Sequence, residues 1–265
     1  MRALVTTPHG ARLVDRPPPV APPGWVRLDV RMAGVCRTDV AAARGALPVE
    51  NGRILGHELA GRTPDGGLVS VRPRLPDGRF LGLQLDGAFA EQVVVPMSAL
   101  VRLPEDMDLR RAAFVEPVAA ATSVTSILPS AGRVALRGEG RIAELCRRVI
   151  QLLGVRLVDE DDGGIDVLVV TSVGPVLDLS GVRKGGRVVL KGRPAGPVLI
   201  DQRAIVEREL TVQGVDYGDF DEAAALLASG ELAVDDLFAE PVSLDRFAQA
   251  FEGREDRKNL LVPTR

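Results

Sequence analysis

The chain has 265 residues, of which 46% are hydrophobic and 26% are charged, a composition typical of a globular protein. Its formal net charge of −3 provides no basic field for nucleic acid or for an anionic membrane. The apolar runs are far shorter than the ~20 residues that span a bilayer, and the N-terminus lacks the pattern of a signal peptide. We therefore expect a cytoplasmic protein that acts on a small molecule, without a nucleic-acid or membrane partner.

Short strand-like segments dominate the first third of the chain. Residues 24–35 alternate apolar and polar side chains, and segments 52–62 and 89–96 carry further short runs of strand-forming residues. The proline-rich segment 16–24 predicts a loop, because proline lacks the amide donor that a sheet ladder needs. A β-rich N-terminal domain is indicated.

From about residue 130 the pattern changes to alternating strands and helices. A strand over 133–138 precedes a helix over 141–154, whose apolar residues recur at helical spacing and which Gly154 closes. The later segments are apolar enough to be strands buried on both faces of a parallel sheet. These strands are predicted over 155–159, 165–170, 186–192 and 209–215, followed by helices over 219–230 and 243–253 and a last short strand over 258–263.

Two scarce residue types lie in similar surroundings in the first third. Cys36 in "GVCRTDV" is one of two cysteines and His57 in "LGHELAG" is one of two histidines, and each stands close to a carboxylate. Thiolate and imidazole suit zinc, and a catalytic site needs three protein ligands and an open position. Glu58 and Glu116 are the candidates for a third ligand. On spacing alone, a buried cysteine and a hydrogen-bonded histidine remain the simpler interpretation.

Four motifs, in order along the chain, carry a resemblance to a known family: "GVCRTDV", "LGHELAG", "DGAFAEQVVVP" and "AAFVEPVAAAT". The chain resembles the zinc-dependent medium-chain alcohol/polyol dehydrogenases, above all the threonine and sorbitol dehydrogenase branch. The resemblance implies an α/β protein with a GroES-like β-rich catalytic domain over 1–125 and a shortened Rossmann-type nucleotide-binding domain over 126–238. Residues 239–265 would return to the catalytic domain.

The same resemblance implies one catalytic zinc. Cys36, His57 and Glu116 would hold it, and Glu58 would serve as a fourth or alternating ligand. Asp39 would hydrogen-bond His57 and fix its tautomer.

Two departures from the family pattern concern the proton path and a second metal. Thr38 would bond the substrate oxygen and pass its proton onward, but Ala41 stands where relatives often continue the relay with a polar residue. The cysteine-rich lobe that binds a structural zinc in many relatives is absent. We therefore expect no structural zinc.

A glycine-rich turn lies between the predicted strand 133–138 and the predicted helix 141–154. Gly138, Gly140 and Ala143 match the dinucleotide-binding spacing, in which glycines admit a pyrophosphate to a helix N-terminus. Arg141 and Arg137 would add charged contacts to phosphate oxygens. The alternative is a tight strand-to-helix turn without a ligand.

The adenosine side of this domain looks incomplete. Asp159 lies about 20 residues after the glycines, as a ribose-binding acid would, although an acidic run is also typical of a solvated loop. The segment between 159 and 165 is far shorter than the dozen or more residues of a parallel crossover. One helix and one strand of the usual Rossmann half are therefore missing, and the acidic rim favours NAD(H) over NADP(H).

The leading functional prediction is hydride transfer between a secondary alcohol or ketone and NAD(H). The alternatives are a redox-neutral zinc lyase or cyclase that has lost cofactor binding, and a non-catalytic binding protein. Segment 210–215, an apolar last strand with an uncovered edge, predicts a homodimer.

Overall fold

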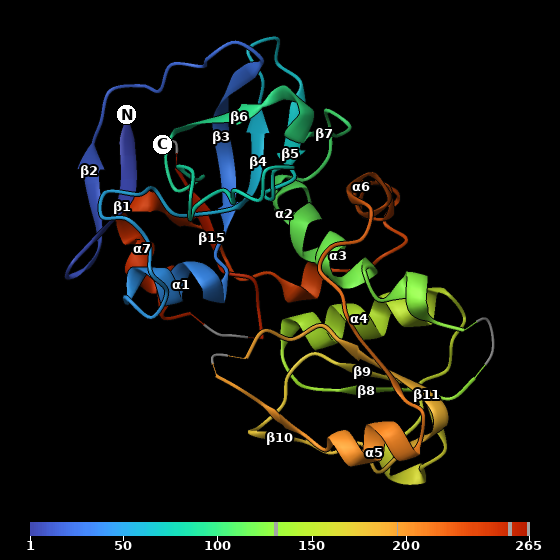
Figure 1. Cartoon of the computed structure of the whole chain (residues 1–265). Coiled ribbons are helices and arrows are strands. Elements are labelled where there is room, and N and C mark those ends of the chain that lie inside the picture. The colour runs from blue at the N-terminus through green and yellow to red at the C-terminus, as the bar shows by residue number, and fades with distance from the viewer. Residues whose placement is uncertain (130–131, 195, 254–255, 264–265) are drawn as a thin grey trace. The chain divides into compact units, whose positions relative to one another are not determined.

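The protein consists of two compact units in a computed structural model that describes residues 1–129, 132–194, 196–253 and 256–263 (Figure 1). The first unit comprises Met1–Pro117 and Phe220–Arg265, and the second comprises Val118–Asp219. From the sequence, boundaries are expected after residues 125 and 238. The units divide earlier in the chain, after Pro117 and after Asp219. Helix α6 (Phe220–Ser229) belongs to the first unit because it packs against α2 (Leu109–Ala113) and β7 (Leu100–Arg102).

The first unit is built on a mainly antiparallel sheet whose centre is β3, with β14 added parallel to β15. Strand β3 pairs with β4, β6 and β15, and the sheet continues from β4 through β5 to β7 (Figure 1). The hairpin of β1 and β2 forms a separate two-stranded sheet. The remaining elements of this unit are β1 (Arg2–Thr7), β2 (Gly10–Asp15), β3 (Trp25–Gly34), α1 (Arg37–Ala43), β4 (Glu58–Arg62), β5 (Leu68–Val71), β6 (Gln92–Pro96), β14 (Val242–Ser243), α7 (Phe247–Phe251) and β15 (Leu260–Val262).

The alternation of side chains along β3 explains why this sheet forms. Leu28 and Val30 are fully buried in the core of the unit, while Arg27, Asp29 and Arg31 between and beside them are exposed. Such a period of two residues is what a half-buried strand requires.

The second unit contains a four-stranded parallel sheet in the order β13-β11-β9-β8. Helix α4 follows β8 and contacts it, and Figure 1 shows this helix along one face of the sheet. The mixed α/β architecture is the one that the sequence predicted. The chain enters the unit through α3 (Val115–Thr122) and continues as β8 (Val134–Arg137), α4 (Arg141–Leu152), β9 (Ile165–Val170), β10 (Val176–Leu177), β11 (Val182–Leu190), β12 (Leu199–Ile200), α5 (Gln202–Glu207) and β13 (Thr211–Gly214).

Two strand predictions in this unit were wrong in part. Segment 155–159 forms no strand and contributes only one bridge, between Leu157 and Val134 of β8. The chain then makes one 3-10 turn over Glu160–Asp162 and enters β9, which pairs directly with β8. Strand β13 lies at the edge of the sheet, and most of its residues are exposed, so it is not buried on both faces. In the described ranges no helix is both long and apolar enough to cross a bilayer.

Candidate metal centre and nucleotide-binding turn

Antiparallel pairing of β3 with β4 brings the two scarce residues together. Cys36 follows β3 as the N-terminal cap of α1, and His57 directly precedes β4. The register sets Gly34 opposite Glu58. Ligand atoms of Cys36, His57 and Glu58 consequently all lie within 4.8 Å of one another.

Asp39 connects the two motifs from a fully buried position in α1. One carboxylate oxygen accepts the backbone N–H of Cys36 at 2.9 Å, and the other accepts that of Gly56 at 3.1 Å. The second oxygen also lies 3.1 Å from Nδ1 of His57. Burial by itself lowers the pKa of His57, but the charge and hydrogen bond of Asp39, helped by Cys36, raise it well above its ordinary value.

Glu58 has a counter-ion that the sequence did not reveal. Lys258, just before β15 and 1% exposed, places its Nζ 2.5 Å from both carboxylate oxygens of Glu58. The same Nζ donates to the carbonyl of Val35 at 3.4 Å and lies 5.9 Å from the ring centroid of Phe114. A buried ion pair thus stands directly beside the thiol and the imidazole.

Gly34 makes room for this ion pair. A Cβ at Gly34 would lie 2.1 Å from Oε2 of Glu58, a distance that no real contact reaches. We expect Gly34→Ala to lower the free energy of unfolding by about 1–3 kcal/mol, the usual cost of overpacking a core. Urea denaturation measures this loss. Gly214→Ala is the matched control, because a Cβ there meets nothing within 4 Å, and equal losses in the two variants would contradict the prediction.

Glu116 and Thr38 occupy different places relative to the cluster. Glu116 is 6% exposed in the first turn of α3 and is not part of the group whose ligand atoms lie within 4.8 Å. Thr38 is half-buried, with its hydroxyl 3.7 Å from the Cys36 sulfur. The ring of Phe80 packs against the imidazole of His57, with ring centroids 5.2 Å apart.

The residues present fit a catalytic zinc. Sulfur, imidazole nitrogen and carboxylate oxygen are the donors that such sites use. Donors about 2.0–2.3 Å from one ion stand roughly 3.3–3.8 Å apart, so a cluster within 4.8 Å closes on zinc with small shifts. Cys146 takes no part, because it is buried in α4, where desolvation raises the pKa of its thiol to about 12.

The two glycines of the turn between β8 and α4 serve different purposes. A Cβ at Gly138 would lie 2.1 Å from the hydroxyl of Thr171 and 2.7 Å from the amide of Ser172, so only glycine fits there. Gly140 caps α4 with φ of +83° and faces open space, since a Cβ there meets no atom within 4 Å. The side chain of Ala143, in α4, is buried in the second unit. The turn therefore keeps open backbone at the start of a twelve-residue helix, as a phosphate site requires.

Two of the charged side chains predicted to contact the nucleotide, Arg137 and Asp159, already have partners within the chain. The Arg137 guanidinium forms an ion pair with Glu160 and donates to the carbonyl of Asp178 at 2.7 Å, so the predicted phosphate contact would compete with these partners. Asp159 accepts the backbone N–H of Asp161 at 3.1 Å and caps the 3-10 turn. Arg141 occupies the first position of α4, where the sequence predicted it.

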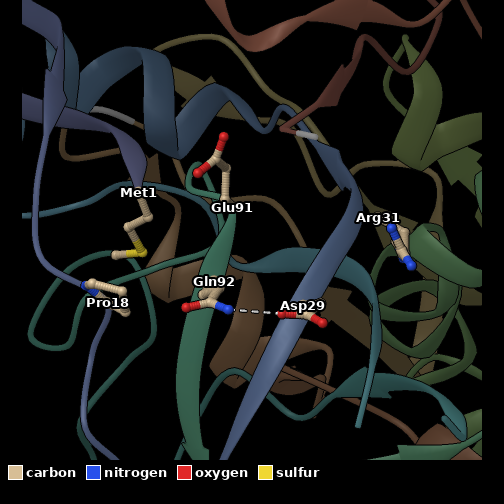
Figure 2. A pocket seen from close by; sticks show the side chains of 6 residues that line it. All are labelled: Met1, Pro18, Asp29, Arg31, Glu91 and Gln92. Carbon is tan, nitrogen blue, oxygen red and sulfur yellow. Dashed lines mark hydrogen bonds between the residues drawn. The ribbon is translucent and has the colours of Figure 1, made fainter. Parts of the chain in front are cut away.

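A polar hollow on the first unit is separate from these residues. It measures about 370 Å³ and is lined by Met1, Pro18, Asp29, Arg31, Glu91 and Gln92 (Figure 2). The acids there already have donors, since Gln92 donates to Asp29 at 2.9 Å and the backbone N–H of Arg2 donates to Glu91 at 3.0 Å. This hollow contains none of the candidate zinc ligands.

Comparison with known proteins agrees with the geometry. Residues 22–105 match the alcohol dehydrogenase GroES-like domain. The L-threonine 3-dehydrogenase of Thermococcus kodakarensis is 26% identical, over 95% of this chain and 94% of that protein. The sorbitol dehydrogenase of Halalkalibacterium halodurans is 26% identical over 99% of both. A zinc-binding dehydrogenase of Sinorhizobium meliloti, solved with NADP, superposes with a TM-score of 0.88 at 22% identity, over 99% of both chains. Over nearly its whole length this chain is similar to dehydrogenases that act on alcohols, polyols and threonine.

The chain is shorter than these relatives. The alignment with the sorbitol dehydrogenase extends over 342 positions, whereas this chain has 265 residues, so it lacks residues that the relative has. One shortened place lies in the parallel sheet. Segment 155–159 contributes only the bridge at Leu157 in place of a strand, and β9 pairs directly with β8.

Proposed function

We propose that this protein is a zinc-dependent oxidoreductase that transfers a hydride between a secondary alcohol or ketone and NAD(H). The observation that carries the proposal is the cluster of Cys36, His57 and Glu58, whose donor atoms and spacing fit a catalytic zinc. Zinc bound there supplies Lewis-acid chemistry, which polarises the carbon–oxygen bond of the substrate. The third protein ligand is Glu116 or Glu58.

The chain's own residues prepare this chemistry. Asp39 accepts a hydrogen bond from the N–H of His57 Nδ1 and so leaves Nε2 for the metal. The hydroxyl of Thr38, beside the Cys36 sulfur, binds the substrate oxygen and holds its proton. Ala41 has no group that accepts this proton, so the proton leaves through water or through another group. Phe80 shields His57 from solvent.

A redox-neutral lyase or cyclase on this scaffold is less well supported. The relatives are named dehydrogenases, and Gly140 keeps open backbone at the start of α4. The test uses the zinc-loaded protein with a panel of secondary alcohols, polyols and 2-amino-3-hydroxy acids, and follows the absorbance of the reduced nicotinamide. Production of NADH with one of these substrates is the expected result. Turnover of a substrate without any redox change of the cofactor would overturn the proposal.

We also propose that the protein is a homodimer. The outer edge of β13 pairs with no strand in the described part of the chain, and Thr211 and Gln213 on it are exposed. An open sheet edge of this kind pairs across a two-fold axis. We expect a sedimentation mass about twice the 28.2 kDa of the monomer at micromolar concentration. A monomer mass under these conditions would contradict the proposal.

A further inference from the structure

Glu58 lies between two places where its carboxylate can bind a cation. On one side it belongs to the cluster with Cys36 and His57, in which ligand atoms of all three residues lie within 4.8 Å of one another. On the other side both of its oxygens lie 2.5 Å from Nζ of Lys258. A metal ion in the cluster and the ammonium group of Lys258 would therefore attract the same two oxygens.

The surroundings of this ion pair make the attraction of Lys258 strong. Glu58 and Lys258 are each 1% exposed, so bulk water does not screen the two charges. The other contacts of Nζ are with neutral groups, the carbonyl of Val35 at 3.4 Å and the ring of Phe114 at 5.9 Å from its centroid. A buried charge that loses its partner is costly. The ammonium group therefore stays on Glu58 unless another cation takes the carboxylate.

Strand pairing holds the two charged side chains in contact across Gly34. This glycine at the end of β3 lies opposite Glu58 of β4 on one side and opposite Leu260 of β15 on the other, two residues after Lys258. A Cβ at Gly34 would lie 2.1 Å from Oε2 of Glu58, so the glutamate side chain crosses the space that this glycine leaves open. The position of Lys258 thus depends on the sheet and not on a mobile surface side chain.

We propose that Lys258 competes with the metal for Glu58 and thereby makes Glu58 an exchangeable ligand in place of a permanent one. The inference rests on the proposed function, because it concerns the metal of that reaction. Groups that contact a ligand, without touching the metal, change metal affinity by about 10–100-fold. Lys258 is a positioning residue of this kind, and it acts by withdrawing a carboxylate. We therefore expect Lys258→Met to bind zinc about tenfold more tightly, or more tightly still.

A second variant separates the carboxylate from the simple loss of a positive charge. In the double variant Lys258→Met with Glu58→Gln, no carboxylate is released toward the metal. Its zinc affinity should therefore stay within about tenfold of the wild type. Competition of the zinc-loaded, full-length proteins with a chelator of known affinity measures the dissociation constants, and the double-variant cycle gives the coupling between the two side chains.

Cobalt(II) in place of zinc reports the ligands directly, because its visible absorption depends on their number, kind and geometry. We expect the cobalt spectrum of Lys258→Met to differ from that of the wild type, since Glu58 then stays on the metal. Lys184→Met is the matched control. Lys184 pairs with Glu209 at 2.7 Å, with side chains 66% and 68% exposed, and its loss should change neither the zinc affinity nor the cobalt spectrum.

Three results would overturn the inference. Zinc binding in Lys258→Met that is no tighter than in the wild type would show that the lysine does not compete. Equal tightening in the single and double variants would mean that only a positive charge matters. Weakening by more than about tenfold in the double variant would show that Glu58 is a permanent ligand beside Lys258.

The double variant leaves no uncompensated buried charge, so it decides the question even where Lys258→Met does not fold, and melting curves establish which variants are folded. Production of NADH by the zinc-loaded wild type tests the proposed function separately. Failure of the inference and failure of the proposed function can thus be told apart.

Discussion

Replacing Cys36 by serine is expected to remove the zinc and lower the rate of hydride transfer about a thousandfold or more, which corresponds to about 4 kcal/mol of transition-state stabilisation. Cys36 contributes the thiolate of a cluster whose donor atoms lie within 4.8 Å of one another. A hydroxyl in its place is a poor zinc donor at neutral pH. Metal analysis and the initial rate with the best substrate measure the two effects.

Cys146→Ala is the matched control for this experiment. Cys146 is the other free cysteine and is buried in α4. It lies far along the chain from Cys36 and His57 and is not part of their cluster. Its loss leaves a small cavity that lowers stability, but the zinc content should stay at one ion per chain. Zinc retention in Cys36→Ser, or zinc loss in Cys146→Ala, would refute the ligand assignment.

Replacing Lys258 by methionine is expected to destabilise the zinc-free protein by about 3–5 kcal/mol, the usual cost of removing one partner of a buried ion pair. Lys258 is 1% exposed and its Nζ lies 2.5 Å from both oxygens of Glu58. The variant leaves a buried carboxylate without its counter-ion. The zinc-loaded protein should lose less stability, because the metal attracts the freed carboxylate.

The double variant Lys258→Met with Glu58→Gln separates the ion pair from simple packing. With both charges removed, most of the stability should return, since a matched neutral pair avoids the uncompensated charge. Guanidinium denaturation of the wild type, both single variants and the double variant gives the coupling energy. A loss below about 1 kcal/mol in the Lys258→Met single variant would contradict the buried pair.

The sequence predicted the parts of this site that depend on local motifs. Cys36 and His57 lie in short motifs whose amino-acid sequences already resemble those of a known family. The antiparallel pairing of β3 with β4 then brings the two residues together. Lys258 gave no signal, because a lysine at the start of a short strand usually lies in solvent. Its role depends on the pairing of β15 with β3, whose residues are far apart in the sequence.

The fold was predictable to a similar degree. Alternating and apolar runs identified β3, β9 and β11, since these strands are half-buried or buried. Segment 155–159 has the composition of a strand but lacks the neighbouring elements that would hold it in a sheet. The sequence also predicted the helix α6, but it did not predict that α6 packs against α2 and β7.

The pairing of β15 with β3 bears on how the protein is made. A nascent chain that ends before Lys258 contains Cys36, His57 and Glu58, yet Glu58 has no counter-ion and the end of β3 lacks its β15 neighbour. Such contacts between distant residues form late, because closing a long loop costs entropy before the contact compensates for it. Glu58 therefore gains its counter-ion only after the chain has been synthesised past Lys258.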